Sequence, residues 1–358
     1  MGLSLLGTRG NMTDLALPEI IADVEQLEEL LSRPTAAVVE ALSRIEGDIL
    51  VLGVAGKMGP TLARMARRAS DAAGGRRRII GVSRFSHAEV RRRLESQGIE
   101  AIQGDLLDPD FLDCLPQAPN VISMTAMKFG ATGREPATWA VNTHLPALVC
   151  RKFHRSRLLV FSTGNVYGTV PVGSGGSRET DPPDPRGEYA MSCLGRERLI
   201  EYFSQTLGVP AVLIRLNYAV EMRYGVLVDL AQKVYGGQTV DLTMGYFNTI
   251  WQGEANARAL CALPDASSPP LILNVTGPEC LKVRDVCRQF AERMGKSVHF
   301  SGVEAGDALL SNADEAQRRY GPIHISSDQM IGWIAHWVTH RGPTLGKPTR
   351  FQVRDGKF

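Results

Sequence analysis

Three glycines at positions 53, 56 and 59 have the spacing of a phosphate-binding turn. They follow the apolar run 48–51 and precede residues 60–66, whose composition is typical of a helix. Strand, glycine turn and helix in this order form the nucleotide-binding unit of α/β proteins. We expect Gly53 to permit a sharp turn, Gly56 to leave room for a pyrophosphate and Gly59 to let the helix pack against the strand.

The N-terminus of the following helix would present free N–H groups to the phosphates. We therefore predict that a dinucleotide binds here, although an ordinary strand-to-helix turn is the alternative. The predicted contacts of this turn are Gly53, Gly56, Lys57, Met58 and Gly59.

Seven short apolar runs must position this turn. We predict strands at 49–54, 79–82, 101–103, 121–124, 158–161, 212–216 and 272–275, with helices between the first six. Buried runs that alternate with helices indicate a parallel sheet covered on both faces. The predicted fold is therefore α/β, a doubly wound parallel Rossmann sheet with a smaller C-terminal substrate lobe and an added N-terminal helical segment.

The helical segment comes from apolar residues at helical spacing in residues 14–46, which predict two helices separated by Pro34. The expected organisation is an N-terminal extension at 1–47 and a Rossmann domain at 48–216 and 250–278. The substrate lobe and C-terminal tail would take 217–249 and 279–358.

Ligands of such sheets bind beyond the carboxyl ends of the strands. Ser83 and Arg84 follow the second strand, where an acidic residue would bind the adenosine ribose, and no acidic residue is present. A guanidinium at this place can pair with a 2′-phosphate, which favours NADP over NAD. The remaining predicted cofactor contacts after strands three and four are Asp105, Leu106, Thr125 and Ala126.

Composition limits the classes of partner. The chain has 358 residues, 44% hydrophobic and 22% charged, with a net charge of +2. This balance gives no bulk electrostatic reason to expect nucleic acid or a membrane as partner. Six scattered cysteines without a C-x-x-C pair predict reduced thiols in the cytoplasm. The opening residues 1–7 lack the features of a signal peptide, and Met12 is a candidate start.

Several ordered stretches together resemble the extended short-chain dehydrogenase/reductase family of NAD(P)-dependent epimerases and dehydratases. The resemblance covers about residues 48–300. Besides the glycine turn, it rests on 104–108 (GDLLD), 141–142 (VN), 161–168 (FSTGNVYG), 188–190 (EYA), 214–217 (IRLN) and 273–277 (LNVTG).

The resemblance implies that Tyr189 shuttles a proton while hydride moves to or from the nicotinamide. It also implies that Thr163 bonds the substrate oxygen and that Asn142 belongs to the cofactor site. The family places a lysine four residues after the tyrosine, where its charge lowers the tyrosine pKa. This chain has Cys193 there instead, and Arg196 lies two helical turns from Tyr189.

Three interpretations of the missing lysine stay open. Tyr189 is activated by another cation, either the nicotinamide or Lys128 from the loop after strand four. Alternatively, Cys193 or another group does modified acid–base work on a tightly held cofactor. In the third, the site is inactive and the chain is a non-catalytic NAD(P)-binding regulator or scaffold. We favour an NAD(P)-dependent epimerase, dehydratase or oxidoreductase acting on a carbohydrate or polyol.

Polar and aromatic residues after the sixth strand suit a sugar, because rings stack on sugars and amides bond hydroxyls. The predicted substrate contacts are Asn165, Asn217, Tyr218, Tyr224 and Trp251. The resemblance also implies a homodimer through helices near 136–153 and 188–204. His336 and His340 have the i, i+4 spacing of zinc ligands, but the tryptophans between them favour a packed helix, so no metal is predicted.

Overall fold

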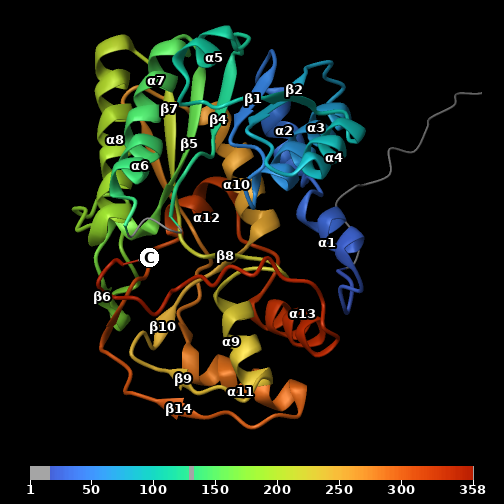
Figure 1. Cartoon of the computed structure of the whole chain (residues 1–358), viewed down its shortest axis with the longest axis vertical. Helices are drawn as coiled ribbons and strands as arrows, with labels where there is room; N and C mark the ends of the chain where they lie inside the picture. Colours follow the sequence, from blue (N-terminus) through green and yellow to red (C-terminus); the bar gives the residue numbers. More distant parts are fainter. Residues whose placement is uncertain (1–16, 129–132, 358) are drawn as a thin grey trace, which may run out of the picture.

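The structure, a computed structural model, describes residues 17–128 and 133–357. Its centre is one parallel sheet of seven strands in the order β12-β7-β5-β4-β1-β2-β3 (Figure 1). These strands are β1 (Ile49–Leu52), β2 (Ile79–Ser83), β3 (Glu100–Gln103), β4 (Asn120–Ser123), β5 (Arg157–Thr163), β7 (Ala211–Leu216) and β12 (Leu271–Val275). All seven predicted strands are present, and the predicted doubly wound fold is confirmed.

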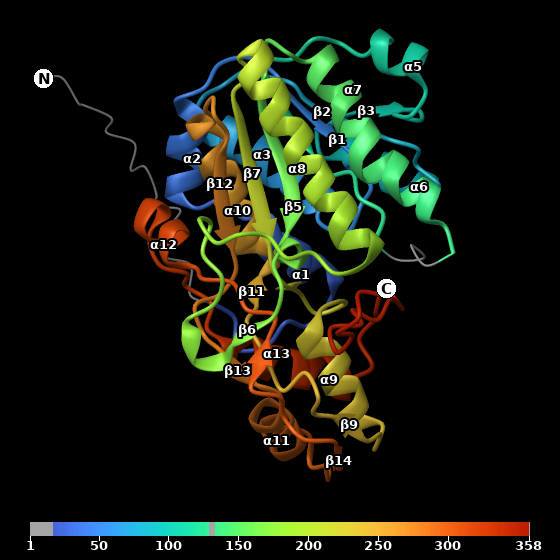
Figure 2. The same ribbon diagram turned by 90° about the vertical axis from the view of Figure 1, so that its left-hand side faces the viewer.

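Alternate residues of each central strand enter two separate apolar cores. In β1, Ile49 and Val51 face one core, whereas Leu50 and Leu52 face the other. The first core is closed by α2 (Ala36–Ser43), α3 (Gly59–Ala72), α4 (Ala88–Ser96) and α10 (Gln252–Ala262). The second is closed by α5 (Pro109–Cys114), α7 (Leu145–Lys152) and α8 (Gly187–Leu207), and Figure 2 shows α8 lying along β5 and β7. Burial on both faces explains why the strands read as continuous apolar runs.

The strand order reverses between β1 and β4. The chain runs from β1 outward through β2 to β3 and then returns to β4 on the other side of β1. A crevice opens beyond the carboxyl ends of the strands at such a switch point. The glycine turn after β1 and the segment 124–128 after β4 therefore lie side by side at this edge.

A third apolar core forms the C-terminal lobe, built around α9 (Val226–Tyr235), α11 (Val283–Met294) and α13 (Ser327–Thr339). Figures 1 and 2 show this lobe below the carboxyl edge of the sheet. Short strand pairs surround it: β6 (Val170–Pro171) with β15 (Asp307–Ala308), β8 (Ala219–Val220) with β11 (Ile250–Trp251), β9 (Val240–Asp241) with β14 (Phe300–Ser301), and β10 (Tyr246–Phe247) with β13 (Leu281–Lys282). The other helical segments are α6 (Glu135–Trp139), a π-helix (Ala140–His144), α12 (Asp314–Tyr320) and short 3₁₀ turns at Gly164–Val166, Val172–Ser174 and Leu263–Asp265.

The two predicted N-terminal helices are α1 (Val24–Leu31) and α2, but they begin later than residue 14. Asp23 caps α1 by accepting a hydrogen bond from the Gln26 amide at 2.8 Å, so the helix cannot extend further back. Thr35 caps α2 in the same way after Pro34. The expectations about a signal peptide and about Met12 concern residues 1–16, which lie outside the described residues.

No helix within the described ranges combines the length and apolar character needed to cross a bilayer. The predicted division into an extension, a Rossmann domain and a substrate lobe by residue range stays a prediction.

Gly59 gives the first testable prediction. A Cβ added there would lie 2.2 Å from the carbonyl oxygen of Val54, a backbone atom that cannot move aside. Gly59→Ala should therefore lower the free energy of unfolding by about 1–3 kcal/mol, as overpacked sites do. Urea denaturation measures this. Gly173→Ala is the control, because nothing lies within 4 Å of a Cβ at that position. Equal free energies of unfolding for the two variants would show that Gly59 does not lie this close to the Val54 carbonyl.

Candidate functional site

A cavity of about 1000 Å³ lies at the carboxyl edge of the sheet, between the Rossmann domain and the C-terminal lobe. Its walls come from the glycine turn, the ends of β2, β4 and β5, the start of α8, residues 216–226 and the tail at 345–349. Segments far apart in the sequence thus meet at the switch point, where a parallel sheet binds its ligand.

The glycine turn has the geometry expected of a phosphate cradle. Gly53 has φ +81°, a conformation that L side chains rarely adopt, and its carbonyl accepts the Gly56 amide at 3.0 Å. Gly59 opens α3, and Pro60 occupies a first-turn position. The helix therefore points its free N–H groups at the cavity beside a backbone that carries no Cβ at Gly56.

The predicted cofactor contacts divide into two groups. The cavity lining includes Gly53, Gly56, Lys57, Met58, Gly59, Arg84 and Ala126. It does not include Ser83, Asp105, Leu106, Thr125 and Asn142. Thr125 packs beneath Gly53, with its methyl group 3.1 Å from where a Cβ on Gly53 would lie. Asp105 is exposed and accepts the Leu107 amide at 3.0 Å.

Asn142 is fully buried in the π-helix and contacts protein groups. Its Oδ1 accepts the Met127 amide at 2.8 Å, and its Nδ2 donates to the Met127 carbonyl at 3.1 Å. The same Nδ2 lies 3.0 Å from the hydroxyl of Ser192 on α8. Asn142 therefore fixes the residue before Lys128 against the helix that carries Tyr189.

Tyr189, Thr163 and Cys193 meet at one point on the cavity wall. The Tyr189 hydroxyl shares hydrogen bonds with the side chains of Thr163 and Cys193. Burial raises the pKa of both Tyr189 and Cys193, so both groups carry their protons at neutral pH. Tyr189 and Thr163 face the cavity, whereas Cys193 lies behind them and has no exposed surface.

Lys128, from the loop after β4, also lies close to this group. Its Nζ lies 5.6 Å from the centre of the Tyr189 ring, and it lines the cavity. Burial lowers the pKa of Lys128 to about 8, and the nearby Cys193 and Asp229 act in the opposite direction. The loop after β4 thus places an ammonium beside the tyrosine without using the position four residues after it.

A second lysine extends from the glycine turn toward the C-terminal lobe. The Lys57 Nζ lies 3.3 Å above the centre of the Tyr224 ring. Burial and then the positive charges of Lys128 and Lys347 lower the pKa of Lys57 to about 7. Three lysines therefore share one cavity, and the charges of Lys128 and Lys347 disfavour the charged form of Lys57.

The predicted substrate residues also divide. Asn165, Tyr218 and Tyr224 line the cavity. Asn217 is buried outside it and donates to Asn248 at 2.8 Å. Trp251 is buried in the core of the C-terminal lobe, where its ring packs against Trp333.

A buried ion pair supports the wall from behind. Arg215 on β7 binds Glu197 on α8 at 2.7 Å, and both side chains are almost completely buried. Ser162 on β5 also donates to Glu197, and Arg215 donates to the Tyr167 hydroxyl at 2.6 Å. This network ties α8 to the strands on which Thr163 stands.

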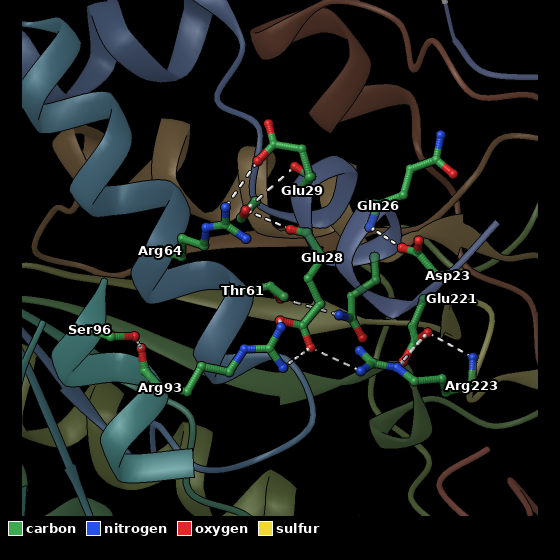
Figure 3. Close-up of polar contacts among 12 residues, drawn as sticks. Asp23, Gln26, Glu28, Glu29, Thr61, Arg64, Arg93, Ser96, Glu221 and Arg223 are labelled. Atoms are coloured by element: carbon green, nitrogen blue, oxygen red, sulfur yellow. Dashed lines mark hydrogen bonds and ion pairs between the residues drawn. The ribbon is translucent and has the colours of Figure 1, made fainter. Parts of the chain in front are cut away.

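Sequence reasoning missed the charged cluster at the other end of the cavity (Figure 3). Glu28 of α1 binds Arg93 of α4 and Arg223 of the C-terminal lobe, and all three line the cavity. Lys347 of the tail was also missed. No local motif marks these residues, because the charges that pair are 65 and 195 positions apart for Glu28.

Residues 49–220 match the NAD dependent epimerase/dehydratase family. These residues are similar to that family, which is a family of enzymes. The predicted resemblance is confirmed. None of the curated proteins compared with the chain matches it.

Solved structures share the fold at low sequence identity. MoeE5 in complex with UDP-glucose and NAD has 22% identity, covers 82% of this chain and 99% of its own, and has a TM-score of 0.65. UDP-glucuronic acid 4-epimerase from Bacillus cereus has 17% identity, coverage of 83% and 99%, and a TM-score of 0.66. DesIV, the dTDP-glucose 4,6-dehydratase from Streptomyces venezuelae, has 16% identity, coverage of 82% and 97%, and a TM-score of 0.69.

The described ranges contain no group of three His, Cys, Asp or Glu side chains arranged to hold a metal ion. The rings of His336 and His340 stack on each other, with centroids 4.0 Å apart.

The pKa of Lys128 yields the second prediction. An unfolded lysine has a pKa near ~10.4, whereas folded Lys128 has a pKa of about 8, so the unfolded chain binds more protons between these values. The free energy of unfolding of the dinucleotide-free protein should therefore rise with pH over this interval. Relative to Lys128→Met, the rise should reach about 3 kcal/mol.

Urea denaturation of the wild type and the variant at a series of pH values measures this difference. Lys296→Met, which removes an exposed lysine at the end of α11, is the control and should follow the wild type. Parallel curves for the wild type and Lys128→Met would show that Lys128 is not desolvated.

Proposed function

We propose that this protein is an NAD(P)-dependent epimerase or dehydratase of sugar nucleotides in which Lys128 does the work of the family's missing lysine. The observation that carries the proposal is the Lys128 ammonium 5.6 Å from the Tyr189 ring in the same cavity as the glycine turn. A cation at this distance in a buried site favours the phenolate form of tyrosine.

In this mechanism Thr163 holds the substrate hydroxyl by a hydrogen bond, and the Tyr189 phenolate, whose own proton has passed to solvent, accepts the hydroxyl proton. A dinucleotide held by the glycine turn would supply the hydride acceptor. Lys128 stabilises the phenolate while it exists and favours return of the proton to the substrate oxygen when the hydride returns. A base works best when its pKa lies near the operating pH, and the raised pKa of Tyr189 makes such a cation necessary.

Two other candidates for the lysine's role are less suitable. The raised pKa of Cys193 keeps its thiol neutral, so it brings no positive charge. Arg196 directs its guanidinium to the Asn142 carbonyl and Oδ1, both at 3.1 Å, and to the Phe161 carbonyl. The charge of Arg196 lowers the pKa of Tyr189, but burial still keeps that pKa above its ordinary value, so Arg196 alone is not sufficient.

The cavity and the structural neighbours both support a sugar nucleotide as the substrate. Two neighbours are complexes with UDP-glucose or UDP-glucuronic acid, and a third is a dTDP-glucose dehydratase. Asn165 offers an amide for sugar hydroxyls, and Tyr218 and Tyr224 offer rings. A sugar nucleotide suits a cavity with several cationic side chains, because its diphosphate is anionic.

We propose that Arg84 favours NADP, although the neighbours named above contain NAD. Arg84 is exposed at the edge of the cavity, beyond the end of β2.

We also propose a homodimer through α6 and α8, where Trp139, Met191, Tyr202 and Leu207 are exposed. The free cysteines fit the reducing cytoplasm.

The third prediction concerns catalysis. Lys128→Met should lower kcat by about 10²–10⁴-fold on whichever of UDP-glucose, UDP-glucuronic acid or dTDP-glucose the wild type converts, with dinucleotide affinity changed little. Tyr189→Phe should have a similar effect. Lys296→Met is the control and should retain full activity.

Relocating the lysine makes the test specific. The double variant Lys128→Met/Cys193→Lys returns the ammonium to the family's position and should recover part of the lost kcat. Full activity of Lys128→Met would show that another group takes the role of the family's lysine. A wild type that binds dinucleotide yet converts none of a broad sugar-nucleotide panel would favour a regulator or scaffold.

The fourth prediction concerns the cofactor. Arg84→Ala should weaken NADPH binding about ten-fold and leave NADH binding nearly unchanged, because only NADPH has a 2′-phosphate for the guanidinium to bind. Isothermal titration calorimetry measures both affinities. Arg92→Ala removes an exposed charge from the neighbouring helix α4 and serves as the control. Equal losses for both dinucleotides would exclude this role of Arg84.

A further inference from the structure

Helix α1 precedes the Rossmann domain in the sequence but packs into the C-terminal lobe. Ile21, Leu27 and Leu31 are fully buried in the same apolar core as α9, α11 and α13. The indole N–H of Trp333 on α13 donates to the Pro18 carbonyl at 2.9 Å, just before the helix. Movement of the C-terminal lobe relative to the sheet would therefore carry α1 with it.

The polar face of α1 binds the Rossmann domain (Figure 3). Glu29 binds Arg64 at 3.0 Å and Arg68 at 2.7 Å, both on α3. Glu28 binds Arg93 on α4, on the Rossmann side. Helix α1 is thus fixed to one lobe by apolar packing and to the other by ion pairs.

Glu28 differs from Glu29 because it also binds the C-terminal lobe directly. Its carboxylate accepts Arg223 at 3.0 Å, and Arg223 is held in turn by Glu221 at 3.0 Å. The Glu28 side chain is only 9% exposed, whereas that of Glu29 is 37% exposed. Ion pairs in such sheltered surroundings are screened less than surface pairs, so breaking this one is more costly.

The Glu28 cluster lies in the cavity wall. Glu28, Arg93 and Arg223 line the cavity together with Thr61 and Arg64 of the helix that the glycine turn begins. The ion pair from Arg93 through Glu28 to Arg223 therefore crosses from one lobe to the other beside the place predicted for the dinucleotide.

We propose that α1 is a latch, closed by Glu28, that retains the dinucleotide in the cavity through many turnovers. The proposal rests on the proposed function and narrows it. In an epimerase or dehydratase the hydride taken from a substrate C–H bond returns to the same substrate molecule, to the same carbon in an epimerase and to another carbon, after loss of water, in a dehydratase. The dinucleotide is regenerated in place and has no need to leave.

A reductase, in contrast, consumes one dinucleotide in each turnover and must exchange it. A latch would slow such an enzyme at every cycle. The arrangement around Glu28 therefore favours a redox-neutral reaction over net oxidation or reduction of the substrate.

Stopped-flow fluorescence of NADH or NADPH, whichever the protein binds more tightly, tests the latch. Glu28→Gln keeps the shape of the side chain and removes its charge. It should raise both the dissociation and the association rate of the dinucleotide at least ten-fold, with Kd changed less than about three-fold. Opening a barrier speeds passage in both directions, whereas loss of a direct contact speeds dissociation alone.

Glu25→Gln is the matched control on the same helix, because the Glu25 side chain is exposed and lies outside the ion pairs that join the two lobes, so it should leave both rates near those of the wild type. If Glu28→Gln fails to fold, Arg93→Met breaks the same ion pair from a side chain that is 43% exposed and should give the same rates. Unchanged rates in the variant, or a faster dissociation with an unchanged association, would overturn the latch. Failure of the wild type to bind any dinucleotide would instead overturn the proposed function.

Discussion

The amide of Asn142 is the contact on which the candidate site depends. It is bound to both backbone groups of Met127 and to the hydroxyl of Ser192. Ser192 in turn donates to the Tyr189 carbonyl at 2.9 Å. One buried side chain thus fixes the loop that carries Lys128 relative to the helix that carries Tyr189. A buried amide left without these partners would cost about 1–3 kcal/mol, so the arrangement is strongly preferred.

The wide turn of the π-helix at Ala140–His144 belongs to the same arrangement. π-turns in helices are rare and are common at functional sites, because they turn a side chain away from the position that a regular helix would give it. Here the Asn142 carbonyl also accepts a hydrogen bond from Arg196, whose guanidinium reaches the end of β5. Strand β5, the loop after β4 and helix α8 are therefore held together before any ligand binds.

Local signals in the sequence were sufficient for the fold and for half of the site. Apolar runs marked the central strands because both of their faces are buried, whereas the edge strand β3 is partly exposed. The glycine spacing marked the turn at Gly53 because glycine adopts its φ without strain. The contacts of Glu28 and Lys347 left no such signal. Their partners are distant in the sequence, and a glutamate on an amphipathic helix or a lysine in a tail is most often an exposed charge. Asn217 and Trp251 are residue types that suit a sugar, but both side chains are buried away from the cavity. The pattern of a single sequence does not show which polar or aromatic side chains are buried.

Cys193 shows why a motif is better tested by geometry than by position. The family's lysine acts through its charge near the tyrosine. The effect of that charge depends on its distance from the tyrosine and not on the helix or loop that carries it. The distance from Lys128 to Tyr189 satisfies that requirement from another loop. A lysine at position 193 would be held in position by α8 itself. Lys128 lies in a loop, so its position depends on the hydrogen bonds between Asn142 and Met127. Lys57 and Lys347 share the cavity with it, and burial together with the charges of Lys128 and Lys347 lowers the pKa of Lys57 to about 7. An anionic ligand would relieve this repulsion, because it raises the pKa of each lysine it approaches, and so the charge that activates Tyr189 would be strengthened when the cavity is filled.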